Sequence, residues 1–113
     1  MNALANTVHL IGRLGADPEI RKFENSQKVS LRLATNESHK DQNGDYVTNT
    51  LWHNVVAWGN ICDALVKLLK KGHQVAVIGK LNYGQYEDKE GNKKHYTEVV
   101  LRDFMKLTHE KKE

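Results

Sequence analysis

The chain has 113 residues, of which 39% are hydrophobic and 27% are charged, a composition that suits one small folded domain and argues against disorder. A formal net charge of +3 permits a nucleic-acid partner without requiring one. The apolar runs are too short for a membrane span or a signal peptide. The lone Cys62 cannot form an internal disulfide and fits the cytoplasm.

The first half of the chain predicts two strands and a tight turn. Residues 7–14 alternate in polarity, and a break at 15–18 ends in the only proline. Residues 28–35 form the second expected strand, and residues 41–45 contain Asn-Gly, a strong hairpin signal. In the second strand the expected inward residues are Val29, Leu31 and Leu33, and the outward residues are Ser30 and Arg32.

A third strand and a helix follow. Residues 50–58 are rich in β-branched and aromatic side chains, which favour a strand. Apolar residues then recur at helical spacing over residues 61–69. Asn60 is the expected N-cap of this helix, and Gly72 its C-terminal stop.

Two further strands, at 73–83 and 94–107, are joined by a polar loop at 87–93. The order of three strands, one helix and two strands predicts an all-β fold, a five-stranded OB-fold Greek-key barrel with one α-helix between strands 3 and 4. An antiparallel sheet with one loose helix is the alternative. We expect a single domain over residues 1–108, with 109–113 as a short C-terminal end.

Catalysis is poorly supported by the sequence, and we expect no enzyme. It has no phosphate-binding loop, nucleophile elbow or zinc-protease motif. Cys62 could be paired with His53 as a nucleophile, but a small buried hydrophobic residue is the simpler interpretation. The six histidines lack metal-ligand spacing, so neither a metal nor another cofactor is expected, and no small-molecule substrate is indicated.

Two tryptophans are the most informative residues. Trp52 and Trp58 lie six positions apart on one expected strand and therefore share a face. They could belong to the barrel core, or they could be platforms on which the bases of a single nucleic-acid strand stack. Several cations at outward or edge positions of neighbouring strands could neutralise phosphates beside them. These cations are Arg13, Arg21, Lys22, Arg32 and Lys80.

Over nearly its whole length the chain resembles the bacterial single-stranded DNA-binding proteins. The stretches that carry the likeness are 6–21 (NTVHLIGRLGADPEIR), 33–38 (LATNES), 52–59 (WHNVVAWG), 72–75 (GHQV) and 96–100 (YTEVV). The resemblance implies an OB-fold that binds single-stranded DNA with little sequence preference in replication, recombination and repair. It also implies a cytoplasmic, nucleoid-associated homo-oligomer, with a tetramer favoured and a dimer as the alternative.

The resemblance also assigns roles to individual residues. Trp52, Trp58 and Tyr86 fall at base-stacking positions of the family, and His39 falls where another stacking tryptophan is common. His53 matches a histidine at the subunit interface, and we expect His9, on the first strand, at an interface as well. The phosphate-binding residues expected alongside these rings are Arg13, Arg21, Arg32 and Lys80.

Apart from His39, the chain departs from the family pattern in two ways. Positions that are often basic near the binding groove are neutral here, which predicts weaker binding and a shallower salt dependence; they are Val47, Asn54, Asn82 and Gly84. Residues 109–113 lack the acidic tip through which family members recruit enzymes. A truncated protein, a paralogue without a tail and a primosomal replication-restart relative that acts mainly through protein contacts all remain open.

Overall fold

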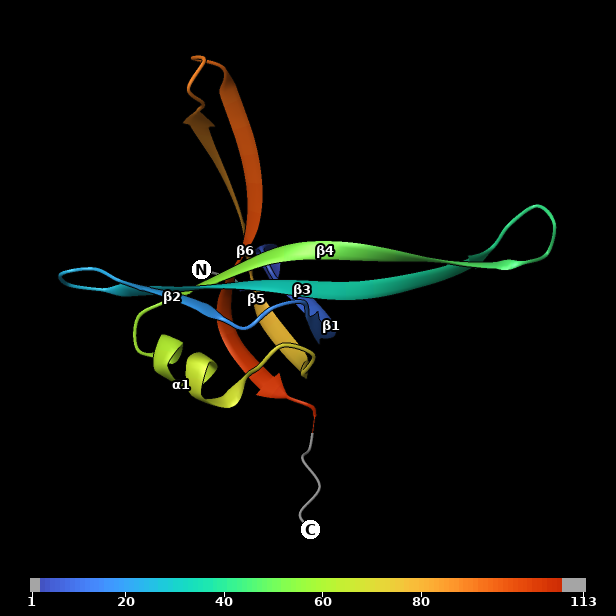
Figure 1. Cartoon of the computed structure of the whole chain (residues 1–113), viewed down its shortest axis with the longest axis horizontal. Coiled ribbons are helices and arrows are strands. Elements are labelled where there is room, and N and C mark those ends of the chain that lie inside the picture. Colours follow the sequence, from blue (N-terminus) through green and yellow to red (C-terminus); the bar gives the residue numbers. More distant parts are fainter. Residues whose placement is uncertain (1–2, 109–113) are drawn as a thin grey trace, which may run out of the picture.

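The structure is a computed structural model that describes residues 3–108, so the C-terminal end expected at 109–113 lies outside the described residues. The elements are η1 (Ala3–Ala5), β1 (Val8–Leu14), β2 (Glu19–Lys22), β3 (Gln27–Lys40), β4 (Tyr46–Trp58), α1 (Ile61–Leu68), β5 (Gln74–Glu87) and β6 (Lys93–Lys106). Figure 1 shows the long strands crossing at the centre of the molecule, with α1 to one side.

Five strands close into a barrel. Their hydrogen-bonded order is β1-β5-β6-β4-β3, and β1 returns to β3 through the pairs Arg13–Ala34 and Leu14–Leu33. Neighbouring strands run antiparallel, except that β4 and β6 are parallel. The predicted five-stranded barrel with one helix after its third strand is therefore confirmed.

The short strand β2 is an addition to this prediction, because the sequence pattern assigned no element to residues 19–22. β2 pairs only with β3 and does not take part in closing the barrel. It has four residues, and only Ile20, opposite Val29, is partly buried. One inward side chain leaves no alternation to detect in a sequence.

Alternating side chains from the strands fill the barrel. Val29, Leu31 and Leu33 of β3 are buried as predicted, and they lie opposite Ala57, Val55 and His53 of β4. Burying each large aliphatic side chain contributes about 1.5–3 kcal/mol to folding. The other members of the core are Leu14, Cys62, Leu65, Leu69, Val75, Val77, Val99 and Leu101. No polar or charged residue of the described chain is buried.

The start of α1 differs from the expected cap. Asn60 occupies the N-cap position, but its backbone is already helical and its side chain makes no capping hydrogen bond. The amide of Cys62 instead donates to the carbonyl of Gly59 at 3.2 Å. Gly59 has a φ of +86°, a left-handed conformation that glycine adopts without strain, and it turns the chain from β4 into the helix.

The end of α1 also lies earlier than predicted. The helix stops at Leu68, because Leu69 is extended and its buried side chain belongs to the core. Gly72 is therefore not the helix stop. It has a φ of +88° and lies in the turn closed by the His73 amide donating to the Lys70 carbonyl at 3.0 Å. None of the helices in residues 3–108 has the length and apolarity needed to cross a bilayer.

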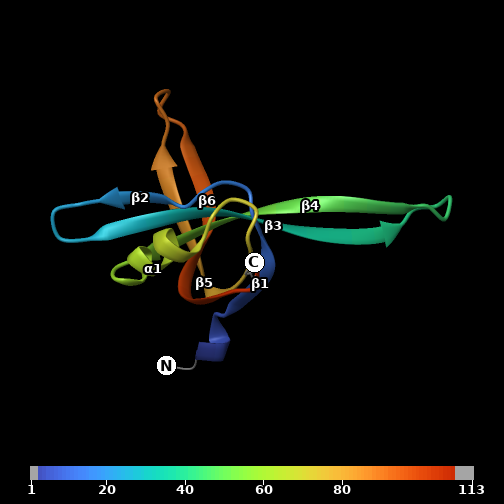
Figure 2. The same ribbon diagram turned by 60° about the horizontal axis from the view of Figure 1, so that its bottom comes forward.

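Two hairpins extend beyond the barrel. Figures 1 and 2 show the β3–β4 hairpin and the β5–β6 hairpin leaving it in different directions. The predicted turn at 41–45 is confirmed, with Gly44 at a φ of +83°. The strands around it are longer than predicted, since β3 continues to Lys40 and β4 begins at Tyr46. Backbone pairing continues there although neither face is buried. The sequence therefore loses its hydrophobic alternation before the strands end.

Candidate nucleic-acid interface

The outer face of β2, β3 and β4 carries the predicted tryptophans. Strand alternation sends one set of β3 side chains into the barrel and the other set, which includes Lys28, Ser30 and Arg32, outward. Their partners on β4 are Trp58, Val56 and Asn54, so these side chains share the outer face. Trp52 lies two residues further along β4 on the same face.

Both indole rings lie at the surface. The exposed fraction is 52% for Trp52 and 49% for Trp58, so neither ring belongs to the core. Each ring has a cation over its face. The guanidinium of Arg32 is 5.2 Å from the centroid of Trp52, and the Nζ atom of Lys28 is 5.3 Å from the centroid of Trp58.

The two rings are supported in different ways. Phe23, in the turn between β2 and β3, stacks on Trp58 with centroids 6.2 Å apart and planes 24° apart. Trp52 instead lies against the backbone of Gly15, where the far edge of the indole occupies the space that a Cβ atom would need. Each ring is thus fixed by a neighbouring group, and about half of the surface of each residue stays exposed.

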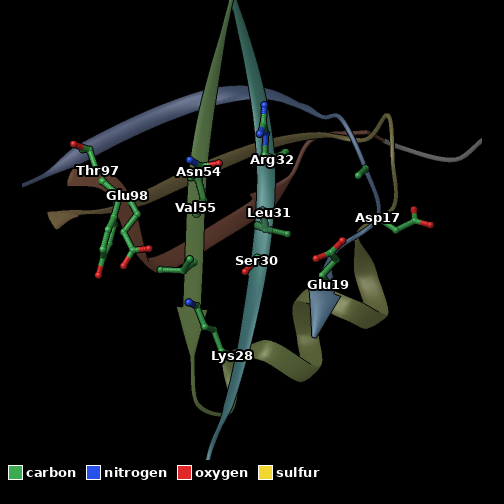
Figure 3. Close-up of a pocket in the computed structure, with 13 residues that line it drawn as sticks. Asp17, Glu19, Lys28, Ser30, Leu31, Arg32, Asn54, Val55, Thr97 and Glu98 are labelled. Atoms are coloured by element: carbon green, nitrogen blue, oxygen red, sulfur yellow. The ribbon is translucent and has the colours of Figure 1, made fainter. Parts of the chain in front are cut away.

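A groove of about 320 Å³ lies on this face, along the stretch of β4 between Trp52 and Trp58, although neither ring lines it. Trp52 lines a second depression of about 200 Å³, which shares Asn54 and Glu98 with the groove. Figure 3 shows Lys28 and Arg32 toward opposite ends of it, with Ser30 between them on β3. Asn54 and Val56 of β4 form part of its wall. The floor of the groove, formed by β3 and β4, is therefore uncharged at its centre and has a cation at each end.

Three carboxylates also line this groove: Asp17, Glu19 and Glu98. Figure 3 shows Glu98 across β3 and β4 from Asp17 and Glu19, and Glu98 accepts a hydrogen bond from the Asn82 amide at 3.2 Å. A phosphate is attracted to the two cations and repelled by the acids. The N–H groups of a base, in contrast, can donate to a carboxylate. The arrangement suits phosphates at the ends of the groove and bases at its centre.

The predicted cations do not all lie at this groove. Arg21 pairs with Lys28 on the outer face, next to the Lys28–Trp58 pair, so it extends that end. Arg13 instead donates from Nη1 to the carbonyl of Gly72 at 3.0 Å, which ties it to the turn after α1. Lys80 is exposed on β5, separated from the groove by β6.

The other predicted stacking residues lie on the two hairpins. Tyr86 is within β5, and its ring is 6.4 Å from that of Tyr96, which lines the groove. Tyr86 is therefore connected to the groove through a second tyrosine. His39 pairs with Val47 far along the β3–β4 hairpin, and strand alternation places it on the face opposite Trp52.

Sequence reasoning missed Lys28, Phe23 and Tyr96. Lys28 could have been found, because it has the same strand parity as Ser30 and Arg32. Phe23 could not, since its contact with Trp58 joins segments that only the folded barrel brings together. Tyr96 could not have been found either, because the sequence does not show that β6 brings this residue to the groove beside β3 and β4.

A second surface carries one of the predicted interface histidines. His9 lies on the outer face of β1, β5 and β6 with several exposed apolar residues around a shallow depression of about 430 Å³. The apolar side chains there include Ile11, Ile78 and Met105. His53 is elsewhere, half-buried on β4, and its Nε2 atom is 2.9 Å from the Thr35 hydroxyl. The structure does not bring the two histidines together.

Comparison with known proteins gives a consistent result. The single-strand binding protein family model matches residues 5–107. Single-stranded DNA-binding protein 1 of Chlorobaculum tepidum is 44% identical over 90% of this chain, and the chain spans only 64% of that protein's length. The mitochondrial single-stranded DNA-binding protein of Drosophila melanogaster is 39% identical over 88% of the chain and 69% of its own length.

A solved structure agrees as well. A single-strand binding protein from Plasmodium falciparum in complex with single-stranded DNA superposes with a TM-score of 0.84 at 33% identity. The alignment covers 91% of this chain and 95% of that one. The barrel described above is thus the fold of these proteins.

Proposed function

The chain belongs to the single-strand binding protein family, and from this premise we propose that it binds single-stranded DNA without sequence preference at the groove between Trp52 and Trp58. Bases stack on the rings, and phosphates bind the neighbouring cations. Stacking does not depend on the identity of the base, because every base has a π-face.

The observation that carries this proposal is the pair of half-exposed tryptophans, each with a cation over its ring, 5.2 or 5.3 Å from the ring centroid. A base stacked on either ring places its phosphate within reach of Lys28 or Arg32. Tyr86 and Tyr96 extend the aromatic surface along the β5–β6 hairpin. Arg21 adds charge beside Trp58, whereas Arg13, Lys80 and His39 contribute at most to the periphery.

This mode of binding selects unpaired strands, since the bases of a duplex are already stacked and paired. By mass action the protein holds DNA open, which is the expected role in replication, recombination and repair. The proposal is for binding without catalysis, because stacking and charge neutralisation require no nucleophile. We place the protein in the cytoplasm, at the nucleoid, where this ligand occurs.

Titration with oligo-dT while recording tryptophan fluorescence tests the proposal. Bases stacked on Trp52 or Trp58 should quench the emission, and duplex DNA of the same length should not. We expect Trp52→Ala to weaken binding by about 1–3 kcal/mol while urea unfolding changes little, because the ring is half-exposed. Unchanged emission at low salt would overturn the proposal and favour a replication-restart module that acts through protein contacts.

We further propose that the protein is a homo-oligomer, with a tetramer favoured over a dimer. Two surfaces support this. The face that includes His9, Ile11 and Ile78 exposes apolar side chains beside one another. In addition, β1 pairs with β3 only at Arg13 and Leu14 within the described residues, which leaves the remainder of this edge available to a second copy.

A further inference from the structure

A third aromatic ring continues the series formed by the two tryptophans. Tyr46, Trp52 and Trp58 are spaced six residues apart on β4, so all three side chains lie on one face. At about 3.3 Å per residue, neighbouring rings are separated by about 20 Å along the strand. The ring of Tyr46 lies near the tip of the β3–β4 hairpin and is 74% exposed.

Each of these rings has its own cation from β3. The Nζ atom of Lys40 is 5.4 Å from the centroid of Tyr46, which matches the 5.3 Å of Lys28 and the 5.2 Å of Arg32 at the two tryptophans. Lys40 is also the direct strand partner of Tyr46, as Lys28 is of Trp58. One aromatic ring with one positive charge is therefore repeated three times along the same face.

The surface between Tyr46 and Trp52 is polar and uncharged, and its side chains are small. Ser38 and Thr48 share a hydrogen bond of 3.0 Å across the strands, and the Thr50 hydroxyl donates to Asn36 at 2.9 Å. By strand alternation these four small side chains lie on the same face as the rings, whereas Glu37 lies on the opposite face. A strand of nucleic acid crossing this surface meets neither a bulky side chain nor a carboxylate before it reaches Tyr46.

We propose that Tyr46 and Lys40 form a third stacking platform, which extends the path of single-stranded DNA from Trp52 along the β3–β4 hairpin. This inference rests on the proposed function and adds a subsite to it. Positive charge and continuity with the groove favour a nucleic-acid strand here over a second copy of the chain. The acidic Asp41 and Asp45 lie in the turn beyond the ring and mark the end of the path.

The experiment compares two lengths of oligo-dT by fluorescence anisotropy. A strand of about six nucleotides is long enough to span a single interval between rings, because stacked nucleotides rise about 3.4 Å each. A strand of about 16 nucleotides can reach all three rings. We expect Tyr46→Ala to lower affinity about 5-fold or more for the long strand while leaving the short strand unchanged, and Tyr46→Phe to restore the loss.

Asn49→Ala is the matched control, because Asn49 is an exposed residue of the same hairpin that pairs with Glu37 and lies on the opposite face. It should leave both affinities unchanged. An unchanged affinity of Tyr46→Ala for the long strand would overturn the inference, as would an equal loss at both lengths. A change in sedimentation mass would assign the ring to contacts between copies. If the unmodified protein bound neither strand, the proposed function itself would fail.

Discussion

Gly15 determines where the ring of Trp52 can lie. Its missing side chain leaves the space that the far edge of the indole fills, and its amide donates to the carbonyl of Arg32 at 2.9 Å. Gly12, three residues earlier, is crowded by the backbone carbonyl of Ala34. Gly15 thus makes room for a side chain, which can rotate away. Gly12 makes room for the backbone of a neighbouring strand, which cannot move without disturbing the sheet.

This difference predicts opposite effects of two similar substitutions. Gly15→Ala should displace the Trp52 ring and weaken binding of oligo-dT by about 1 kcal/mol, with little effect on unfolding. Gly12→Ala should destabilise the fold by about 1–3 kcal/mol, because the new methyl group pushes β1 away from β3. Urea unfolding and anisotropy titrations on both variants check this. A loss of stability in Gly15→Ala as large as in Gly12→Ala would contradict the assignment.

The cations beside the rings should be visible in the salt dependence. A single-stranded ligand releases counterions in proportion to the phosphates that are neutralised, with a slope of about −0.7 per contact. Lys28→Gln should therefore reduce the slope of log K against log salt by about 0.7. Lys67→Gln, an exposed lysine on α1, is the control and should leave the slope unchanged. Equal slopes for the two variants would exclude Lys28 from phosphate binding.

At the scale of elements, the strands that enclose the core were predictable and the hairpin arms were not. Val29, Leu31 and Leu33 alternate with polar residues because one face of β3 is buried. Beyond Thr35 the same strand has no buried face, and its pairing depends on backbone hydrogen bonds that leave no pattern in the sequence. The parity of Trp52 and Trp58 was likewise readable, whereas the stacking of Phe23 on Trp58 depends on the turn between β2 and β3.

Helix α1 buries Cys62 in the core, next to the end of β4. Its Sγ atom lies 3.3 Å from the carbonyl oxygen of Ala57, and burial raises the pKa of the thiol above its ordinary value. Because the fold favours the neutral thiol, the stabilisation is fully present below the ordinary thiol pKa. It is lost as the pH rises through the raised value.

Alkaline pH should therefore destabilise the unmodified protein more than a Cys62→Ala variant. Unfolding free energies from urea titrations at about pH 7 and about pH 10 measure this difference. The variant starts from a lower stability, because the smaller side chain leaves a cavity, so the quantity to compare is the change with pH. A parallel decline in both proteins would mean that the thiol does not contribute.

At the scale of the whole molecule, the apolar face on β1, β5 and β6 is the surface that we propose for contact between copies of the chain. Ile78→Asp should dissociate the proposed oligomer, because burying a carboxylate against the apolar side chains of a second copy costs far more free energy than burying isoleucine. Sedimentation velocity measures the change in mass. Val66→Asp is the matched control, since Val66 on α1 and Ile78 are each 40% exposed. A mass that is unaffected by Ile78→Asp would place the contact between copies elsewhere.

The groove itself is a depression on the outer face of β3 and β4, along the stretch between the two half-exposed tryptophans, and not a tunnel through the barrel. A ligand can settle onto it sideways, at any point along its length, without being threaded from a terminus. Covalently closed circles should accordingly be held as firmly as linear molecules of equal length.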